Sequence, residues 1–263
     1  MQTKPRQGDR MPTAAINRRA YAKGKVLDYY DQLSDLFPAE KALFEKLSRE
    51  IRNAKVLDIG IGGGRTTRYL LPLAAEYTGI DYVPEYIDRV RRKYEKGNFL
   101  VVDARNLTVF VDESFDLVVF SYNGLDVVSH EDRLTALKEI YRVLRKGGTF
   151  IFSSHNRDYQ YFNRPYWFNQ RRFNMTLIKG VLSYLFFLPR HLWMKQHEES
   201  TDEYATINDS DHRYSMLVYY IGIAEQAKQL EDIGFSNVEA YNAAGESVRA
   251  NKESFWIYYL ANR

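Results

Sequence analysis

The 263-residue sequence contains no cysteine. Disulfide bridges, thiolate zinc sites, iron–sulfur clusters and cysteine nucleophiles are therefore excluded. The sequence also lacks a large excess of one charge sign. It has 37 Lys and Arg residues and 34 Asp and Glu residues, which gives a formal net charge of +3. A whole-molecule field that attracts nucleic acid is not expected from this balance. Since 45% of the residues are hydrophobic, a chain of this length can bury a large core without covalent cross-links.

Long hydrophobic runs are missing as well. The longest, Thr176–Pro189, contains Lys179 and is too short to span a bilayer. The N-terminus lacks the apolar segment of a secretory signal, and residues 1–25 carry seven Lys and Arg residues against the single acid Asp9. An organellar transit peptide has a similar composition and is the alternative. We expect a flexible basic arm over residues 1–25, a single domain over residues 26–263, and a cytoplasmic location.

Segments with strand and helix patterns alternate along the chain. The expected strands are Lys55–Ile59, Tyr77–Asp81, Phe99–Asp103, Asp116–Ser121, Gly148–Ser154, Asn237–Tyr241 and Phe255–Leu260. The expected helices are Val26–Arg52, Glu85–Lys96, Glu131–Leu144, which Gly147 and Gly148 end with a left-handed cap, and Ile223–Ile233. This alternation predicts an α/β fold in which helices cover both faces of a parallel sheet.

Residues 157–214 interrupt the alternation and are longer than an ordinary connection. They are rich in Tyr, Phe, Trp and Arg and then in acids, which predicts an inserted aromatic-rich lid or substrate-binding subdomain. Its basic and acidic halves can pair in a folded cap, or can line a pocket for a large, partly apolar acceptor such as a phosphorylated glycan-lipid. A third interpretation is peripheral membrane contact through residues 176–189. In it one helical face lies on the membrane surface and consists of Leu177, Val181, Leu185 and Leu188.

A glycine-rich segment, Gly60–Gly64, follows the first expected strand, where bare backbone can approach a ligand closely. It is not a P-loop, because no lysine follows the glycines. It also departs from the dinucleotide pattern G-x-G-x-x-G, because Arg65 or Thr67 stands where the third glycine is needed. A nicotinamide-dependent oxidoreductase is therefore disfavoured.

The pattern that is present is D-x-G-x-G-x-G, from Asp58 through Gly64. It resembles the first motif of the class I S-adenosylmethionine-dependent methyltransferases. SFDLVVFSYNGL and EIYRVLRKGGTFIFSS resemble later motifs, so that the resemblance covers about residues 50–156. It implies a Rossmann-like, doubly wound sheet of about seven mostly parallel strands, with the last strand antiparallel. It also implies S-adenosyl-L-methionine as the cofactor.

The resemblance further implies where this cofactor binds. Asp81 ends the second strand and is expected to hold the ribose hydroxyls, and Asp103 ends the third strand near the adenine amino group. For Asp103, capping of a turn is an alternative role. Asp58 is also expected to contact the cofactor, and its alternative role is to fix the loop by accepting backbone N–H bonds. For Tyr122, the alternative is a core aromatic. The remaining expected cofactor contacts are Gly60, Gly62, Gly64, Tyr82, Ala104, Ser121 and Tyr122.

Several methyl acceptors are excluded. Attack on cytosine C5 needs a cysteine, and enzymes that methylate exocyclic base amines usually carry [DN]-P-P-[YF], where this chain has Ser121–Gly124 with the sequence SYNG. No RNA-binding signature is present. We therefore expect a small-molecule acceptor, methylated at oxygen, with no nucleic acid and no metal ion. The alternatives are a glycan or lipid-linked precursor at a membrane surface, and a non-catalytic partner protein that keeps the fold.

Transfer to a hydroxyl also needs a base. His155 is the first candidate, because it follows the fifth strand at the edge where open α/β sheets bind ligands and because its ordinary pKa suits proton transfer. A purely structural histidine is the alternative. His212 with Tyr214 is the second candidate, and Asp126 with His130 is the third.

Overall fold

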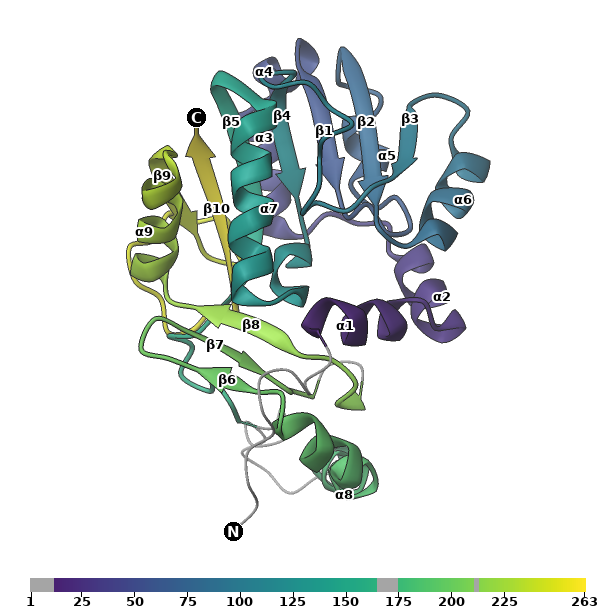
Figure 1. The fold of residues 1–263 in the computed structure, drawn as a ribbon, viewed down its shortest axis with the longest axis vertical. Coiled ribbons are helices and arrows are strands. Elements are labelled where there is room, and N and C mark those ends of the chain that lie inside the picture. Colours follow the sequence, from purple (N-terminus) through teal and green to yellow (C-terminus); the bar gives the residue numbers. More distant parts are fainter. Residues whose placement is uncertain (1–11, 165–174, 211–212) are drawn as a thin grey trace.

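The computed structural model describes residues 12–164, 175–210 and 213–263. In these residues one sheet runs in the order β3-β2-β1-β4-β5-β8-β7-β6, with β10 paired to β5 and β9 paired to β10 (Figure 1). The strands are β1 (Lys55–Ile59), β2 (Glu76–Asp81), β3 (Asn98–Val101), β4 (Phe115–Phe120), β5 (Leu144–Asn156), β6 (Glu199–Ser200), β7 (Tyr204–Ile207), β8 (Val218–Ile221), β9 (Ser236–Tyr241) and β10 (Trp256–Asn262).

The helices precede, connect and cover these strands. They are α1 (Thr13–Tyr21), α2 (Gly24–Gln32), α3 (Pro38–Lys46), α4 (Ser48–Arg52), α5 (Thr67–Leu70), α6 (Pro84–Lys93), the short 3₁₀ helix η2 (Gly124–Val127), α7 (His130–Val143), α8 (Met175–Lys195) and α9 (Ile223–Ile233). Helix α9 and strand β1 have the predicted bounds.

The expected Rossmann-like sheet is confirmed. Strands β1 to β5 pair in parallel, and β10 runs antiparallel to both β5 and β9. The central strands are apolar on both faces, as parallel strands covered by helices must be. Leu57 belongs to a core with α7 and α9, whereas its neighbour Val56 belongs to a second core with α3, α4 and α6. Alternate residues of β1 thus pack into the two cores on opposite faces of the sheet.

The single helix expected over Val26–Arg52 is wrong, because the chain breaks into α2, α3 and α4. Pro38 is the cause of the break before α3, since a proline disfavours helical backbone at the preceding residue, and Phe37 is indeed extended with ψ 154°. The Phe37 N–H donates to the Glu40 carboxylate at 2.8 Å. This bond caps the new helix α3 and directs the Glu40 side chain inward.

The flexible arm expected over residues 1–25 is wrong for its described part, since residues 13–21 form α1 and α2 begins at residue 24. Asn17 of α1 is fully buried. Its amide donates to the carbonyls of Val127 and Leu217, both at 2.7 Å, and its oxygen accepts from the Leu217 N–H at 3.0 Å. Three bonds to distant segments therefore hold α1 in place. Residues 1–11 lie outside the described residues.

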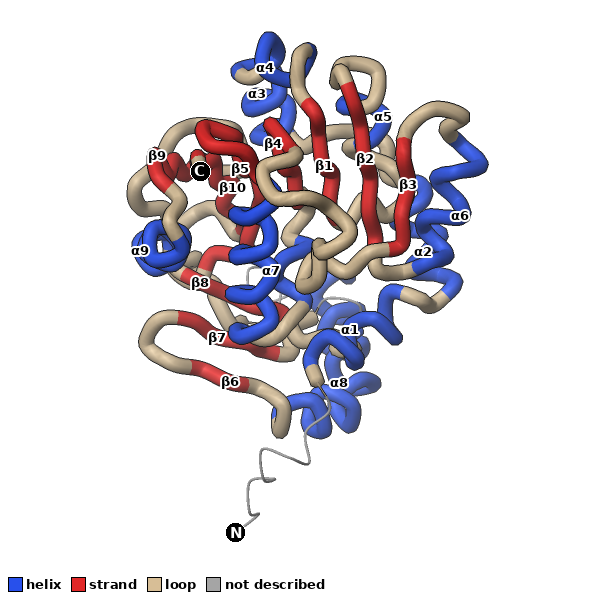
Figure 2. The backbone as a smooth tube through the Cα atoms, turned by 45° about the horizontal axis from the view of Figure 1, so that its top comes forward, coloured by secondary structure: helices blue, strands red, loops and turns tan. Residues whose placement is uncertain are grey.

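The insertion after β5 contains α8 and the antiparallel ribbon β6–β7–β8 (Figures 1 and 2). It extends beyond the predicted residue 214, because β8 pairs with the end of β5 through His155–Tyr220 and Asn156–Ile221. The ribbon therefore continues the sheet at the end of β5, beside the carboxyl ends of the parallel strands. No helix among the described residues is long and apolar enough to cross a membrane.

Candidate functional site

The glycine loop joins β1 to the segment before α5. Gly60, Gly62 and Gly64 all adopt left-handed backbone, with φ of 66°, 50° and 89°. At Gly60 an added Cβ would also lie 2.8 Å from a ring carbon of Phe120. A side chain is therefore excluded there by both conformation and space. The Gly60 N–H donates to the Ile80 carbonyl at 2.8 Å, which ties the loop to β2.

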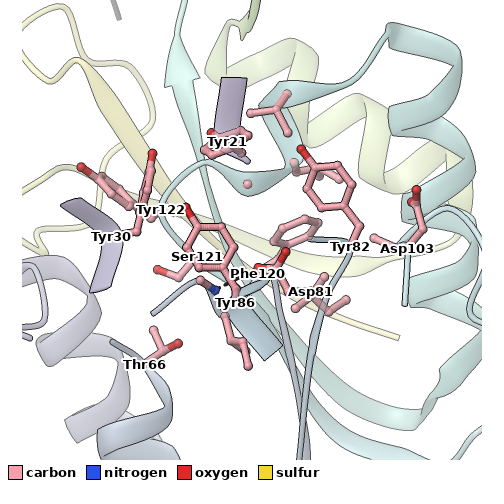
Figure 3. A pocket seen from close by; sticks show the side chains of 18 of the residues that line it. Tyr21, Tyr30, Thr66, Asp81, Tyr82, Tyr86, Asp103, Phe120, Ser121 and Tyr122 are labelled. Atoms are coloured by element: carbon pink, nitrogen blue, oxygen red, sulfur yellow. Dashed lines mark hydrogen bonds between the residues drawn. The ribbon is translucent and has the colours of Figure 1, made fainter. Parts of the chain in front are cut away.

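A cavity lies over this loop, at the carboxyl ends of β1, β2 and β4 (Figure 3). The sequence-predicted residues that line it are Gly60, Gly62, Asp81, Tyr82, Asp103, Ala104, Ser121 and Tyr122. Asp58 and Gly64 do not line it. Tyr21 of α1 and Tyr30 of α2 line it from the N-terminal helices. The structure thus brings together eight residues that were predicted from separate motifs.

Asp81 is buried at the end of β2 with its carboxylate turned to the glycine loop. One oxygen accepts the Gly62 N–H at 3.0 Å and the other accepts the Val83 N–H at 2.9 Å. Burial nevertheless raises the pKa of Asp81 to about 6. Each further hydroxyl group that donates to this poorly solvated carboxylate stabilises its ionised form. The carboxylate is therefore suited to bind the hydroxyls of a ribose.

Asp103 performs the predicted capping role and also lines the cavity. Its carboxylate accepts the Arg105 backbone N–H at 2.9 Å and forms an ion pair with the Arg105 guanidinium at 2.7 Å. Burial acts to raise the pKa of Asp103, but the hydrogen bonds from Arg105 outweigh it and the pKa is lowered. Arg105 also pairs with Asp132 of α7 at 2.7 Å. The wall of the cavity at Asp103 is therefore charged, and the ion pairs of Arg105 hold it in place.

Asp58 supports the loop from below, but not in the expected way. Hydroxyl groups, not backbone N–H groups, are its donors, with Thr66 and Tyr77 both at 2.7 Å. Burial raises the pKa of Asp58 to about 6. Thr66 lies just before α5, so Asp58 connects β1, β2 and the first turn after the loop. Its position outside the cavity makes it a structural support of the loop.

Sequence reasoning missed a buried ion pair beside the loop. The Arg65 guanidinium pairs with the Glu40 carboxylate of α3, with 2.7 Å between Nη2 and Oε1. The Ser121 hydroxyl hydrogen-bonds to Glu40 and lies 3.2 Å from Arg65 Nη2. Arg65 also lies over the rings of Phe37 and Tyr122, at 4.8 and 5.4 Å from their centres. In the sequence, Arg65 stands out only because it occupies the position of the third glycine in the dinucleotide pattern.

A second cavity of about 290 Å³ adjoins the first. The two share Tyr21, Tyr30, Tyr122 and Val127 as a common wall. The residues that line only the second cavity are Tyr29, Asn123, His155, Met216, Val218 and Trp256. Its lining contains no Asp, Glu, Lys or Arg side chain. Tyr122, which sits in left-handed backbone with φ 53°, lies between the two spaces.

His155, the first candidate base, is held by a buried carboxylate. Asp126 of η2 accepts the His155 backbone N–H and faces its ring Nδ1, both at 2.7 Å. Asp126 also accepts from Ser154 at 2.8 Å and from Arg133 at 2.5 Å. A carboxylate at Nδ1 favours the tautomer with a proton on Nδ1, so that Nε2 is the basic nitrogen. Asp126, named third among the candidates, therefore belongs with His155.

The other candidate bases are elsewhere. Tyr214 packs against His191, with ring centres 4.9 Å apart, and lines a different cavity inside the insertion. His130 stacks on Tyr204 at 4.0 Å, and burial lowers the pKa of His130. Neither side chain lines the two cavities described above. His212 lies outside the described residues. Of the predicted bases that the structure describes, His155 alone faces this site.

Comparison with known proteins identifies the central part of the chain. Residues 57–152 match the family model described as a methyltransferase domain. The chain is 30% identical over 141 residues to malonyl-[acyl-carrier protein] O-methyltransferase of Pseudescherichia vulneris, covering 53% of this chain and 55% of the relative. It is 32% identical over 148 residues to ubiquinone biosynthesis O-methyltransferase of Cereibacter sphaeroides, covering 54% and 53%. The chain thus spans about half the length of these curated relatives.

A solved structure shows the same fold over most of the chain. It is that of Burkholderia thailandensis 1,6-didemethyltoxoflavin-N1-methyltransferase, with S-adenosylhomocysteine bound. The TM-score is 0.57 at 18% identity, and the match covers 95% of this chain and 88% of that one. Residues 57–152 are therefore identified as a methyltransferase domain, and the sheet and glycine loop have the fold of the S-adenosylmethionine-dependent methyltransferases.

Proposed function

We propose that the chain transfers a methyl group from S-adenosylmethionine to a hydroxyl oxygen of a small, uncharged acceptor, with His155 as the general base. The observation that carries this proposal is the Asp126–His155 pair, which faces a cavity that adjoins the cavity over the glycine loop. A donor over the loop and an acceptor beside His155 would lie next to each other, because Tyr21, Tyr30 and Tyr122 line both cavities. Such proximity is the main requirement of methyl transfer.

The chain's own residues suit the donor. Backbone in left-handed conformation at Gly60 and Gly62 leaves the loop bare, and Asp81 offers a buried carboxylate beside it. We assign Asp81 to the ribose, Tyr82, Asp103 and Ala104 to the adenine end, and the glycine loop to the homocysteine part. When bound, S-adenosylmethionine supplies an activated methyl group, whose C–S bond breaks with return of the electron pair to sulfur.

The second cavity suits an uncharged ring as acceptor. Five aromatic side chains line it, namely Tyr21, Tyr29, Tyr30, Tyr122 and Trp256. Aromatic faces bind flat apolar rings, and the lack of a charged lining residue disfavours an ionic acceptor. Two of the relatives are named as O-methyltransferases, which supports oxygen as the atom methylated. A phenol meets both requirements.

His155 takes the proton of such a hydroxyl on Nε2 as the new C–O bond forms. Asp126 then stabilises the imidazolium through the bond to Nδ1, and Arg133 and Ser154 keep Asp126 in place. The tyrosines of α1 and α2 line the site and reduce the access of water to the reacting groups.

The test is a comparison of two histidine variants. His155→Gln is expected to lower kcat about 100- to 10,000-fold near neutral pH, because it removes a general base. This decrease in kcat should be smaller at high pH, because a phenol ionises there without a general base. His197→Gln changes a histidine that does not line either cavity and is expected to keep full activity. Transfer of labelled methyl from S-adenosylmethionine to a panel of phenols, alcohols and amines measures the rates.

Three results would contradict the proposal. Full activity of His155→Gln towards a phenol would show that His155 is a structural histidine. Binding of S-adenosylmethionine without transfer to any acceptor in the panel would favour the non-catalytic partner protein. Transfer only to glycan or lipid-linked acceptors added to the panel would favour the membrane-surface alternative. Calorimetric titration of S-adenosylmethionine into each variant serves as the control for an intact donor site.

A further inference from the structure

Helix α8 exposes an apolar face. The described residues include ten exposed large hydrophobic side chains, and six of them lie on α8: Met175, Leu182, Leu185, Phe186, Leu192 and Trp193. Phe186 is 78% exposed and Leu182 is 61% exposed. At about 100° per residue, the six fall within an arc of about 120°. Scattered exposed hydrophobic residues are ordinary, but a continuous stripe of this kind marks an interaction surface.

The inner side of α8 is anchored to the rest of the molecule. Met194 packs with Ile16 of α1 and with Leu217. The ring Nδ1 of buried His191 lies 2.8 Å from the side-chain oxygen of Asn208. These contacts set which face of the helix points outward. The face therefore differs from the sequence prediction, since Leu177, Val181 and Leu188 are half-buried and Leu185 is the one predicted member that is exposed.

The charged side chains of α8 are all positive. Helix α8 contains no Asp or Glu, and Lys179, Arg190 and Lys195 are all exposed. By helical spacing Lys179 and Arg190 border one side of the stripe and Lys195 borders the other. None of the three forms an ion pair with a described acid. The outer surface of α8 is thus apolar with a cationic border.

This pattern selects among the partners that could cover the stripe. A second copy of the chain, joined by a two-fold axis, would place the stripe of one copy and its cations against those of the other. Like charges in such a contact repel. A surface of anionic lipid meets both features, because its acyl region accepts the apolar side chains and its headgroups pair with Lys and Arg. Trp193 is suited to the boundary between them.

We propose that the outer face of α8 binds to an anionic membrane surface, with Phe186 and Trp193 entering the lipid. The helix lies in the plane of the surface and does not span it. The protein is then positioned at a source of membrane-dissolved molecules.

The principal test uses vesicles of phosphatidylcholine alone and of phosphatidylcholine mixed with phosphatidylglycerol. The full chain is expected to co-sediment with the mixed vesicles at low salt. The double variant Leu185→Glu/Phe186→Glu should lose at least tenfold in binding, because it places two acids in the stripe. Lys179→Gln/Arg190→Gln should weaken binding to the anionic vesicles about fivefold for each charge removed. The matched control is Val109→Glu/Val111→Glu, at valines that are 61% and 77% exposed outside α8, and it should bind normally.

A second measurement reports insertion directly. Lipids brominated on their acyl chains quench tryptophans that enter the bilayer, so quenching is expected for the wild-type chain and should fall in Trp193→Phe. Undiminished binding by Leu185→Glu/Phe186→Glu would overturn the proposal. So would an absence of vesicle binding, or a dimer in solution that this double variant dissociates, because a second copy would then cover the stripe. None of these outcomes depends on methyl transfer.

Discussion

Asp81 illustrates how a single residue can couple structure to ligand binding. Its two carboxylate oxygens already accept backbone N–H bonds from the loop and from the turn after β2. Even so, burial raises its pKa to about 6, well above the ordinary value of an aspartate. In the proposed donor site, ribose hydroxyls would donate to the ionised form of Asp81 and favour it. Binding of the donor must therefore lower the pKa of Asp81 and release a proton at acidic pH.

The affinity for S-adenosylmethionine is accordingly expected to depend on pH. Above about pH 7 Asp81 is ionised and the affinity is at its maximum, whereas at pH 5 it should be about tenfold weaker, because about one molecule in ten retains the ionised form. Asp81→Asn should cost about 1–3 kcal/mol of binding free energy at neutral pH and abolish the slope. Calorimetric titrations across this pH range measure both effects. The same slope in Asp81→Asn would assign the titration to another group, such as Asp58, whose pKa is also about 6.

Residues whose roles depend on local pattern were predictable. The glycine loop follows β1, Asp81 ends β2 and His155 lies near the end of β5, so that each can be placed from the order of strands alone. Glu40 was not predictable, because its partner Arg65 lies 25 residues away and no repeat or spacing links them. The Asp126–His155 pair spans 29 residues and forms because β4 and β5 are neighbours in the sheet. Such partners follow from topology, which the sequence pattern constrains only in outline.

At the scale of elements, α3 is attached to the glycine loop by the Glu40–Arg65 pair. Both side chains are nearly fully buried, at 2% and 7% exposed. Removing one partner leaves the other charge without compensation in a buried environment. Arg65 also supports the aromatic rings of Phe37 and Tyr122, so that the pair connects the N-terminal helices to the wall between the two cavities.

Glu40→Gln is therefore expected to lower the free energy of unfolding by about 3–5 kcal/mol. The double variant Glu40→Met/Arg65→Met should recover most of this loss, because two apolar side chains of similar length need no compensation. It will retain a deficit of about 1 kcal/mol, since the cap on the Phe37 N–H is also lost. Urea unfolding of the single and double variants measures the coupling. Strictly additive losses would show that the pair does not interact in the folded protein.

The elements themselves were predicted to different degrees. Strands β1, β2 and β4 lie within a residue or so of the expected ranges, because apolar runs bounded by Gly and Asp are an unambiguous signal. The left-handed cap expected at Gly147 after α7 is wrong. Helix α7 ends at Val143, and Gly147, with φ 74°, lies within the irregular start of β5. The ribbon β6–β8 was not anticipated, because its strands have two to four residues and their composition indicates only a charged, aromatic insertion.

At the scale of the whole molecule, α1 links three parts that are far apart in the sequence. Asn17 is 110 residues from Val127 in η2 and 200 residues from Leu217, which precedes β8. The helix lies across the carboxyl ends of the parallel strands, next to the ribbon (Figure 1). Its last residue, Tyr21, lines both cavities. The Asn17 amide therefore attaches this cover of the site both to η2 and to the insertion.

Asn17→Ala is expected to loosen this cover without unfolding the sheet. It leaves two buried carbonyls and one buried N–H without their partner, at a cost of about 1–3 kcal/mol for each group that stays dry. Detachment of α1 lets water bind to these groups and removes that cost. Local opening of residues 13–32 therefore requires less free energy than keeping the groups buried without partners. Amide hydrogen exchange should therefore accelerate over α1 and α2 while α7 and β4 keep their protection. S-adenosylmethionine should dissociate faster, because Tyr21 and Tyr30 no longer close its cavity. Uniform acceleration across the chain would instead show that Asn17 stabilises the whole fold, and an unchanged exchange pattern would show that α1 is held by its apolar contacts alone.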